Sequence, residues 1–131
     1  MIVADTSVWV DFLRGRANPE TMFLHGALRI RPVIVGDLIL CEVLQGVPDD
    51  RQAERVEALL RRSPIVAMGH DAVAVAAARN YRSLRARGIT IRKTIDLLIG
   101  TFCMREGLPL LHRDRDYDPM EQHLGLRVIH P

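Results

Sequence analysis

The chain has 131 residues, of which 48% are hydrophobic and 26% are charged, as in one globular domain that buries its own core. Its formal net charge of +2 is too small to identify a partner, and no uncharged apolar run approaches the roughly 20 residues of a membrane span. The N-terminus also lacks the pattern of a secretory signal, so we expect a single domain over residues 1–131, cytoplasmic and without a membrane partner.

Short apolar runs alternate with segments of helical periodicity along the chain. In chain order they predict a buried strand at residues 2–4, helices at 6–13 and 19–31, a strand at 33–35, helices at 37–46 and from 49, a strand at 65–67, helices at 71–87 and from 94, a strand at 110–111, a helix from 118 and a last strand at 126–129. Polar residues mark the helix starts, and the predicted caps include Thr6 or Ser7, Asp49, Asp71, Thr94 and Asp118.

Strands separated by helices are typical of parallel βαβ units. The expected fold class is therefore α/β, a three-layer α/β/α sandwich around a four- to five-stranded, mainly parallel sheet. In such sheets, sites form beyond the carboxyl ends of the strands. Asp5 and the loop that holds Asp114 each follow a strand directly, so we expect the functional site at this edge.

Acidic residues stand out in four segments, and each has an alternative explanation. Asp5 ends a strand and can also cap the next helix. Glu42 lies mid-helix among apolar residues, where a carboxylate needs a partner unless it faces solvent. Asp96 lies in a first helical turn, where the helix dipole alone favours an acid. Asp114 is best placed beyond its strand, whereas Asp116 is either a further ligand or a solvated loop acid.

Taken together, the acids are stronger evidence of a site than any one of them alone. If four carboxylates converge at separations of about 4 Å, each like-charge pair costs about 4 kcal/mol at an effective dielectric constant near 20. Divalent cations would remove that cost. Oxygen ligands without His or Cys favour Mg²⁺ or Mn²⁺ over Zn²⁺, and such ions suit phosphoryl chemistry.

Four motifs in this order resemble the PIN-domain family, and within it the VapC toxins of VapBC toxin–antitoxin modules. They are Ile-Val-Ala-Asp-Thr-Ser-Val-Trp at residues 2–9, Leu-Cys-Glu-Val-Leu-Gln-Gly at 40–46, Thr-Ile-Asp-Leu-Leu-Ile-Gly at 94–100 and Leu-Leu-His-Arg-Asp-Arg-Asp-Tyr at 110–117. Each motif alone is weak, but together they span almost the whole chain. His112 departs from the Thr or Asn that many members carry at its position, which puts a helper role there in doubt.

The resemblance implies a metal-dependent endoribonuclease that cleaves structured RNA, either tRNA or rRNA, and so inhibits translation. It implies catalytic roles for Asp5, Glu42, Asp96 and Asp114, with Mg²⁺ or Mn²⁺ held by Asp5, Asp96, Asp114 and Asp116. It further implies a homodimer and a VapB-like antitoxin partner in a heterotetramer or larger assembly.

Lys93 is the one lysine among 18 basic residues, and it lies just before Asp96. With Arg85, Arg87 and Arg92 it forms a basic stretch that we interpret either as an RNA-binding rim or as a solvated surface. Trp9 is expected in the core, so recognition of the RNA backbone and shape is favoured over stacking on aromatic residues.

Other functions remain open at this point. A phosphoacceptor domain would need a lysine near an Asp that follows a central strand, and a dehalogenase-type phosphatase would need an Asp where Ser7 stands. A catalytically weak module that binds RNA or an antitoxin is the main alternative. Cys41 and Cys103 both lie in apolar helical patterns, which predicts two buried, reduced thiols.

Overall fold

A four-stranded parallel sheet forms the centre of the computed structural model, which describes all 131 residues. Its strands are β1 (Ile2–Ala4), β2 (Val33–Gly36), β3 (Ile65–Val66) and β4 (Leu110–Leu111), in the order β3-β2-β1-β4. All residues of β1, β2 and β4 are buried, because helices cover both faces of the sheet. This confirms the predicted fold class, with four strands.

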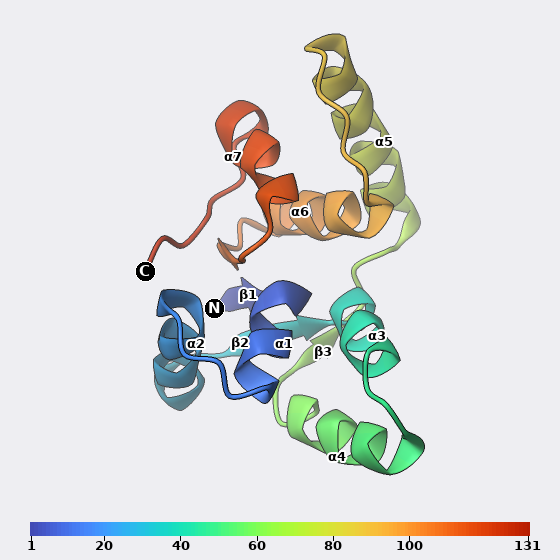
Figure 1. Cartoon of the computed structure of the whole chain (residues 1–131). Coiled ribbons are helices and arrows are strands. Elements are labelled where there is room, and N and C mark those ends of the chain that lie inside the picture. Colours follow the sequence, from blue (N-terminus) through green and yellow to red (C-terminus); the bar gives the residue numbers. More distant parts are fainter.

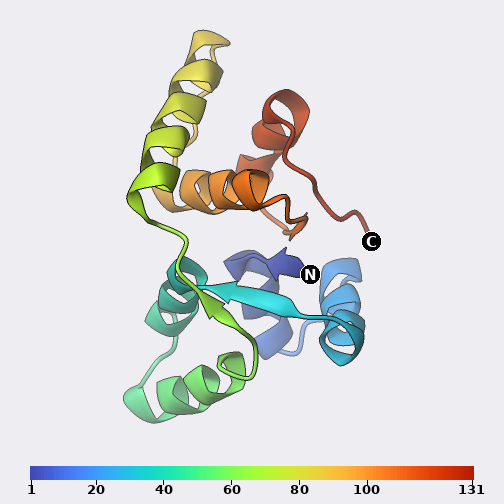
Figure 2. The same cartoon turned by 180° about the vertical axis from the view of Figure 1, so that it is seen from behind.

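Seven α-helices form the two outer layers. One layer holds α1 (Thr6–Leu13), α2 (Pro19–Ile30), α3 (Asp37–Gln45) and α4 (Asp50–Leu60), and the other holds α5 (Asp71–Ala86), α6 (Thr94–Glu106) and α7 (Asp118–Leu124), as Figure 1 and the reverse view in Figure 2 show. A short 3-10 helix, η1 (Arg115–Tyr117), connects β4 to α7. The far end of α5 projects away from the sheet.

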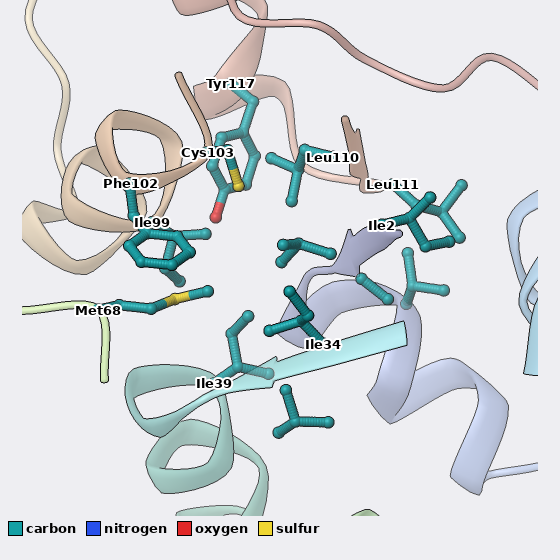
Figure 3. Packing of buried hydrophobic residues seen from close by; sticks show 14 of the residues in the cluster. Ile2, Ile34, Ile39, Met68, Ile99, Phe102, Cys103, Leu110, Leu111 and Tyr117 are labelled. Carbon is teal, nitrogen blue, oxygen red and sulfur yellow. The ribbon is translucent and has the colours of Figure 1, made fainter. Parts of the chain in front are cut away.

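The core is one cluster of 27 buried hydrophobic residues between these layers. Trp9 and Tyr117 are its largest members, and Trp9 is 2% exposed, as predicted. Figure 3 shows Tyr117 beside Cys103, with its hydroxyl pointing toward the sheet. A tyrosine hydroxyl inside a core needs a polar partner, and the partner of Tyr117 lies at the carboxyl end of β1.

The predicted last strand at residues 126–129 is wrong, because the segment forms only one bridge, between Val128 and Leu110. Its partner β4 is only two residues long and offers little backbone to pair with. Cys103 is buried and free as predicted, but Cys41 is exposed. Helix α3 turns Ile39 and Val43 to the core, and a residue halfway between them faces the opposite way.

Several predicted helix caps lie one residue inside the helix. Asp71, Thr94 and Asp118 are first helical residues, and the capping positions belong to His70, Lys93 and Tyr117. Asp49 caps α4 as predicted, because its side chain accepts a hydrogen bond from the Gln52 amide. None of the helices combines the length and the apolar character that crossing a bilayer requires.

Candidate metal centre

Asp5 lies at the carboxyl end of β1 and is 2% exposed. The Ser7 amide and hydroxyl donate to Asp5 Oδ2 at 3.0 and 2.6 Å, so Asp5, rather than Thr6 or Ser7, caps α1. Tyr117 Oη donates to Asp5 Oδ1 at 2.7 Å. Asp5 is thus both the helix cap and a buried acid at the predicted edge of the sheet, so the two interpretations of this residue are compatible.

Glu42 reaches the same edge from α3, and its side chain is partly buried rather than free in solvent. The Thr6 hydroxyl donates to Glu42 Oε1 at 2.7 Å, which fixes the orientation of the carboxylate. Thr6 follows Asp5 directly, so the first turn of α1 positions two of the four predicted acids.

Asp96 is the least favourably placed of the acids. It is 3% exposed, and its Oδ2 is buried without any hydrogen-bond partner. Burial, together with the negative charges of Asp5 and Asp114, raises the pKa of Asp96 to about 7. A helix dipole alone does not require such burial, so the position needs a further explanation, and a cation against Oδ2 supplies one.

Asp114 and Asp116 complete the acidic cluster from the start of η1. The Asp116 amide donates to Asp114 Oδ1 at 3.0 Å, and Lys93 Nζ donates to Asp114 Oδ2 at 3.0 Å. Lys93 Nζ also lies 3.9 Å from Asp96 Oδ2. Burial opposes ionisation of Asp114, but these two donors hold its pKa below the usual value, and its carboxylate in turn raises the pKa of Lys93.

The carboxylates form two groups that share one member. Asp5, Glu42 and Asp96 offer oxygen atoms within 4.8 Å of one another, and so do Asp96, Asp114 and Asp116. The structure therefore brings together all five predicted acids. Every potential metal ligand in these groups is a carboxylate oxygen, which fits a hard divalent ion such as Mg²⁺ or Mn²⁺.

Tyr117 and Ser7 are polar contacts of the site whose roles the sequence did not reveal. Tyr117 is fully buried, and burial beside Asp5 and Asp96 raises its pKa well above the usual value, so its hydroxyl keeps its proton and stays a donor. Ser7 Oγ donates to Asp5 and accepts from the Arg113 amide at 3.0 Å, which ties the ends of β1 and β4 together. No local pattern signals either contact, since the partners lie about a hundred residues apart.

His112 is fixed between the strand end and the tyrosine. Its Nδ1 accepts from the Asp114 amide at 3.0 Å, and its ring centroid lies 4.8 Å from that of Tyr117. Burial lowers the pKa of His112, so the ring is neutral at pH 7. Because Nδ1 is an acceptor, the proton is assigned to Nε2, which is buried and has no partner.

The predicted basic rim is divided between two places. Lys93 lies in the acidic cluster, and the exposed Arg92 precedes it. Arg85 and Arg87 lie at the far end of α5, where the Arg85 guanidinium stands 5.7 Å from the ring centroid of Tyr81. That end of α5 projects away from the sheet (Figure 1), so these two arginines lie apart from the acids at the strand ends.

Comparison with known proteins agrees with this geometry. A family model described as "PIN domain" matches residues 2–121. Ribonuclease VapC11 of Mycobacterium tuberculosis is 31% identical over 130 residues, which cover 98% of this chain and 97% of that protein. The chain is also similar in structure to VapBC2 from Rickettsia felis, solved with a promoter DNA fragment, with a TM-score of 0.78 at 16% identity over 98% of both chains. VapC20 of Mycobacterium tuberculosis, described as a sarcin-ricin loop cleaving toxin, gives 0.67 at 16% identity over 100% of both. The chain belongs to the PIN-domain family, as its four motifs predicted.

Proposed function

We propose that this protein is a metal-dependent endoribonuclease and the toxin of a toxin–antitoxin pair, which stops translation by cutting a structured RNA such as tRNA or rRNA. The observation that carries the proposal is the convergence of five carboxylates in two groups that share Asp96, whose buried Oδ2 has no hydrogen-bond partner. A cation is the ligand that this arrangement favours. Relatives named as ribonucleases support RNA as the substrate.

Asp5, Asp96, Asp114 and Asp116 would hold Mg²⁺ or Mn²⁺ in this proposal. When bound there, such an ion would supply a water molecule of lowered pKa and positive charge to offset that of the phosphate. Glu42, aligned by Thr6, faces the same space and can accept a proton from the attacking water. The water oxygen would then bond to phosphorus as the bond to the leaving ribose oxygen breaks. That oxygen would take a proton from solvent water, and Glu42 would return the proton it accepted to solvent.

Several features support the proposed partners. Arg92 and Lys93 lie beside the acids and can contact phosphates near the cut. Arg85 and Arg87 lie at the projecting end of α5 (Figure 1) and suit a distant part of a folded RNA rather than the cut itself. The similar structures described as toxin–antitoxin and VapBC complexes support a VapB-like antitoxin as the partner. We propose further that the protein forms a homodimer, which assembles with the antitoxin into a heterotetramer or larger complex.

Cleavage of total cellular RNA, with the tRNA fraction included, tests the proposal. The purified protein, free of antitoxin, is incubated with Mg²⁺, with Mn²⁺ or with a chelator, beside Asp5→Asn and the control Asp50→Asn. Asn preserves the helix cap at position 5, and Asp50 is exposed on α4. We expect discrete fragments that require metal and Asp5, and that Asp50→Asn leaves unchanged.

Full cleavage by Asp5→Asn would contradict the site. Absence of cleavage under every condition, together with no metal binding by calorimetry, would favour the module that only binds RNA or antitoxin. If the protein still binds metal, absence of cleavage would mean that the target is missing from that RNA.

A further inference from the structure

A groove beside the acidic cluster has no role in the mechanism above. It has a volume of about 230 Å³ and lies between the start of η1 and the C-terminal segment. Its lining residues include His112, Arg113, Asp114, Arg115, Val128 and Ile129. We call it the tail groove.

The C-terminal wall of the tail groove is fixed to the sheet. The amide of Leu110 donates to the Arg127 carbonyl, and the amide of Ile129 donates to the Leu110 carbonyl, each at 2.9 Å. Val128 bridges to Leu110 as well. Val128 and Ile129 are partly buried, so they offer a held apolar wall rather than a loose tail.

The polar side of the groove is also held in place. Arg113 Nη1 donates to Glu20 Oε2 at 2.7 Å, Arg113 Nε lies 3.5 Å from Asp11 Oδ2, and the Arg113 amide donates to Ser7 Oγ. Two carboxylates thus fix this planar guanidinium and offset its charge. Arg115, by contrast, is exposed and forms no ion pair. His112 lines the same groove, and its Nε2 is a donor without an acceptor.

The tail groove is continuous with the candidate metal centre through Asp114, which lines the groove and belongs to one of the two carboxylate groups. A substrate whose phosphodiester lies at the acids can therefore place a neighbouring nucleotide in this groove. The volume is below the roughly 300–1,000 Å³ of sites for drug-sized ligands, which suits one base rather than several.

We propose that the tail groove binds one unpaired base of the RNA, next to the phosphodiester that is cut. The planar guanidinium of Arg113 and the apolar wall of Val128 and Ile129 suit the faces of a base, and the free Arg115 suits its phosphate. This inference rests on the proposed ribonuclease function and adds to it a source of sequence preference beside the cut.

Two variants test the tail groove. Ile129→Trp fills the groove, and Arg115→Ala removes an exposed side chain without risk to the fold. Arg105→Ala, exposed at the end of α6, is the matched control. The substrates are a single-stranded RNA that contains the mapped cleavage site and bis(p-nitrophenyl) phosphate, a diester without a base.

We expect Ile129→Trp to lower kcat/KM on RNA by about tenfold or more, since stacking of one base accounts for such a factor. Arg115→Ala should weaken RNA cleavage by several-fold, and Ile129→Trp should also broaden the base preference beside the cut. For both groove variants, hydrolysis of the base-free diester and Mn²⁺ affinity by calorimetry should stay within twofold of wild type. The control Arg105→Ala should stay within twofold of wild type in every assay.

The outcomes separate this inference from the proposed function. If wild type cleaves the RNA and both variants cleave it at the same rate and site, the inference about the tail groove is overturned while the proposed function stands. If wild type hydrolyses neither substrate, the proposed function fails. RNA affinity, measured by fluorescence anisotropy with Ca²⁺ present, then tests whether the tail groove binds a base. Equal RNA affinity of wild type and Ile129→Trp would overturn the inference that the groove binds a base. So would variants that bind RNA as wild type does and lose only the binding of antitoxin.

Discussion

Replacing Asp96 by Asn should stabilise the metal-free protein. Asp96 is 3% exposed, its Oδ2 has no hydrogen-bond partner, and its pKa is raised from 3.8 to about 7 by burial and by Asp5 and Asp114. The folded protein therefore keeps a proton that the unfolded chain releases once the pH exceeds about 4. Stability falls as the pH rises from about 4 to about 7, and it stays low above that range.

The size of this effect follows from the pKa values. A rise from 3.8 to about 7 corresponds to about 4 kcal/mol of unfolding free energy, at 1.36 kcal/mol per pKa unit. Asn has nearly the same shape and no charge, so Asp96→Asn should recover about 2–4 kcal/mol at pH 8. For a chain of this length that is a rise in Tm of roughly 8–16 °C.

Urea unfolding with a chelator at several pH values between 4 and 8 measures the effect. Wild type should lose stability over this range, Asp96→Asn should lose much less, and Asp50→Asn should follow wild type. Added Mn²⁺ should stabilise wild type at pH 8 but not Asp96→Asn. A wild-type profile that is flat from pH 4 to 7, or an Asp96→Asn variant less stable than wild type at pH 8, would refute this reasoning.

Three further changes test other parts of the site and core. Tyr117→Phe removes the donor to Asp5 Oδ1 and should cost about 1.5–3 kcal/mol without metal, measured by urea unfolding; an unchanged midpoint would show that the bond does not matter. Lys93→Met should strengthen Mn²⁺ binding by up to about fivefold in calorimetry, because an exposed cation paired with Asp114 no longer competes, and weaker binding would contradict that role. Gly100→Ala places a methyl group against Met120 Sδ and should lower stability by about 1–3 kcal/mol in thermal unfolding, whereas unchanged stability would mean that Met120 moves aside freely.

Local sequence signals predicted most of the secondary structure because their causes are local. The strand at β1 and the helix after it follow from an apolar run and a polar cap. The prediction of a last strand at residues 126–129 was wrong because strand pairing depends on the length of the partner strand, which a local sequence pattern does not reveal. The prediction that Cys41 is buried was wrong because α3 is apolar on more sides than the core covers.

The site divides in the same way. Asp5, Glu42, Asp96 and Asp114 were predictable as candidates because parallel strands end at one edge and because the four motifs resemble a family. Their hydrogen-bond partners were not predictable, since Tyr117 and Asp5 are 112 positions apart in the sequence. Lys93 was predicted to contact RNA, and its pairing with Asp114 depends on a loop geometry that no spacing reveals.

The strand order has a consequence for how the protein is made. Strand β4, close to the end of the chain, pairs directly with β1 at its beginning. Asp114 reaches the other acids only after this pairing, so a growing chain on the ribosome carries Asp5, Glu42 and Asp96 long before they have a complete set of neighbours. If the acids act as proposed, cleavage is confined to chains whose synthesis has passed Asp116. The ribosome that makes this protein is thereby protected from it until Asp116 has been synthesised.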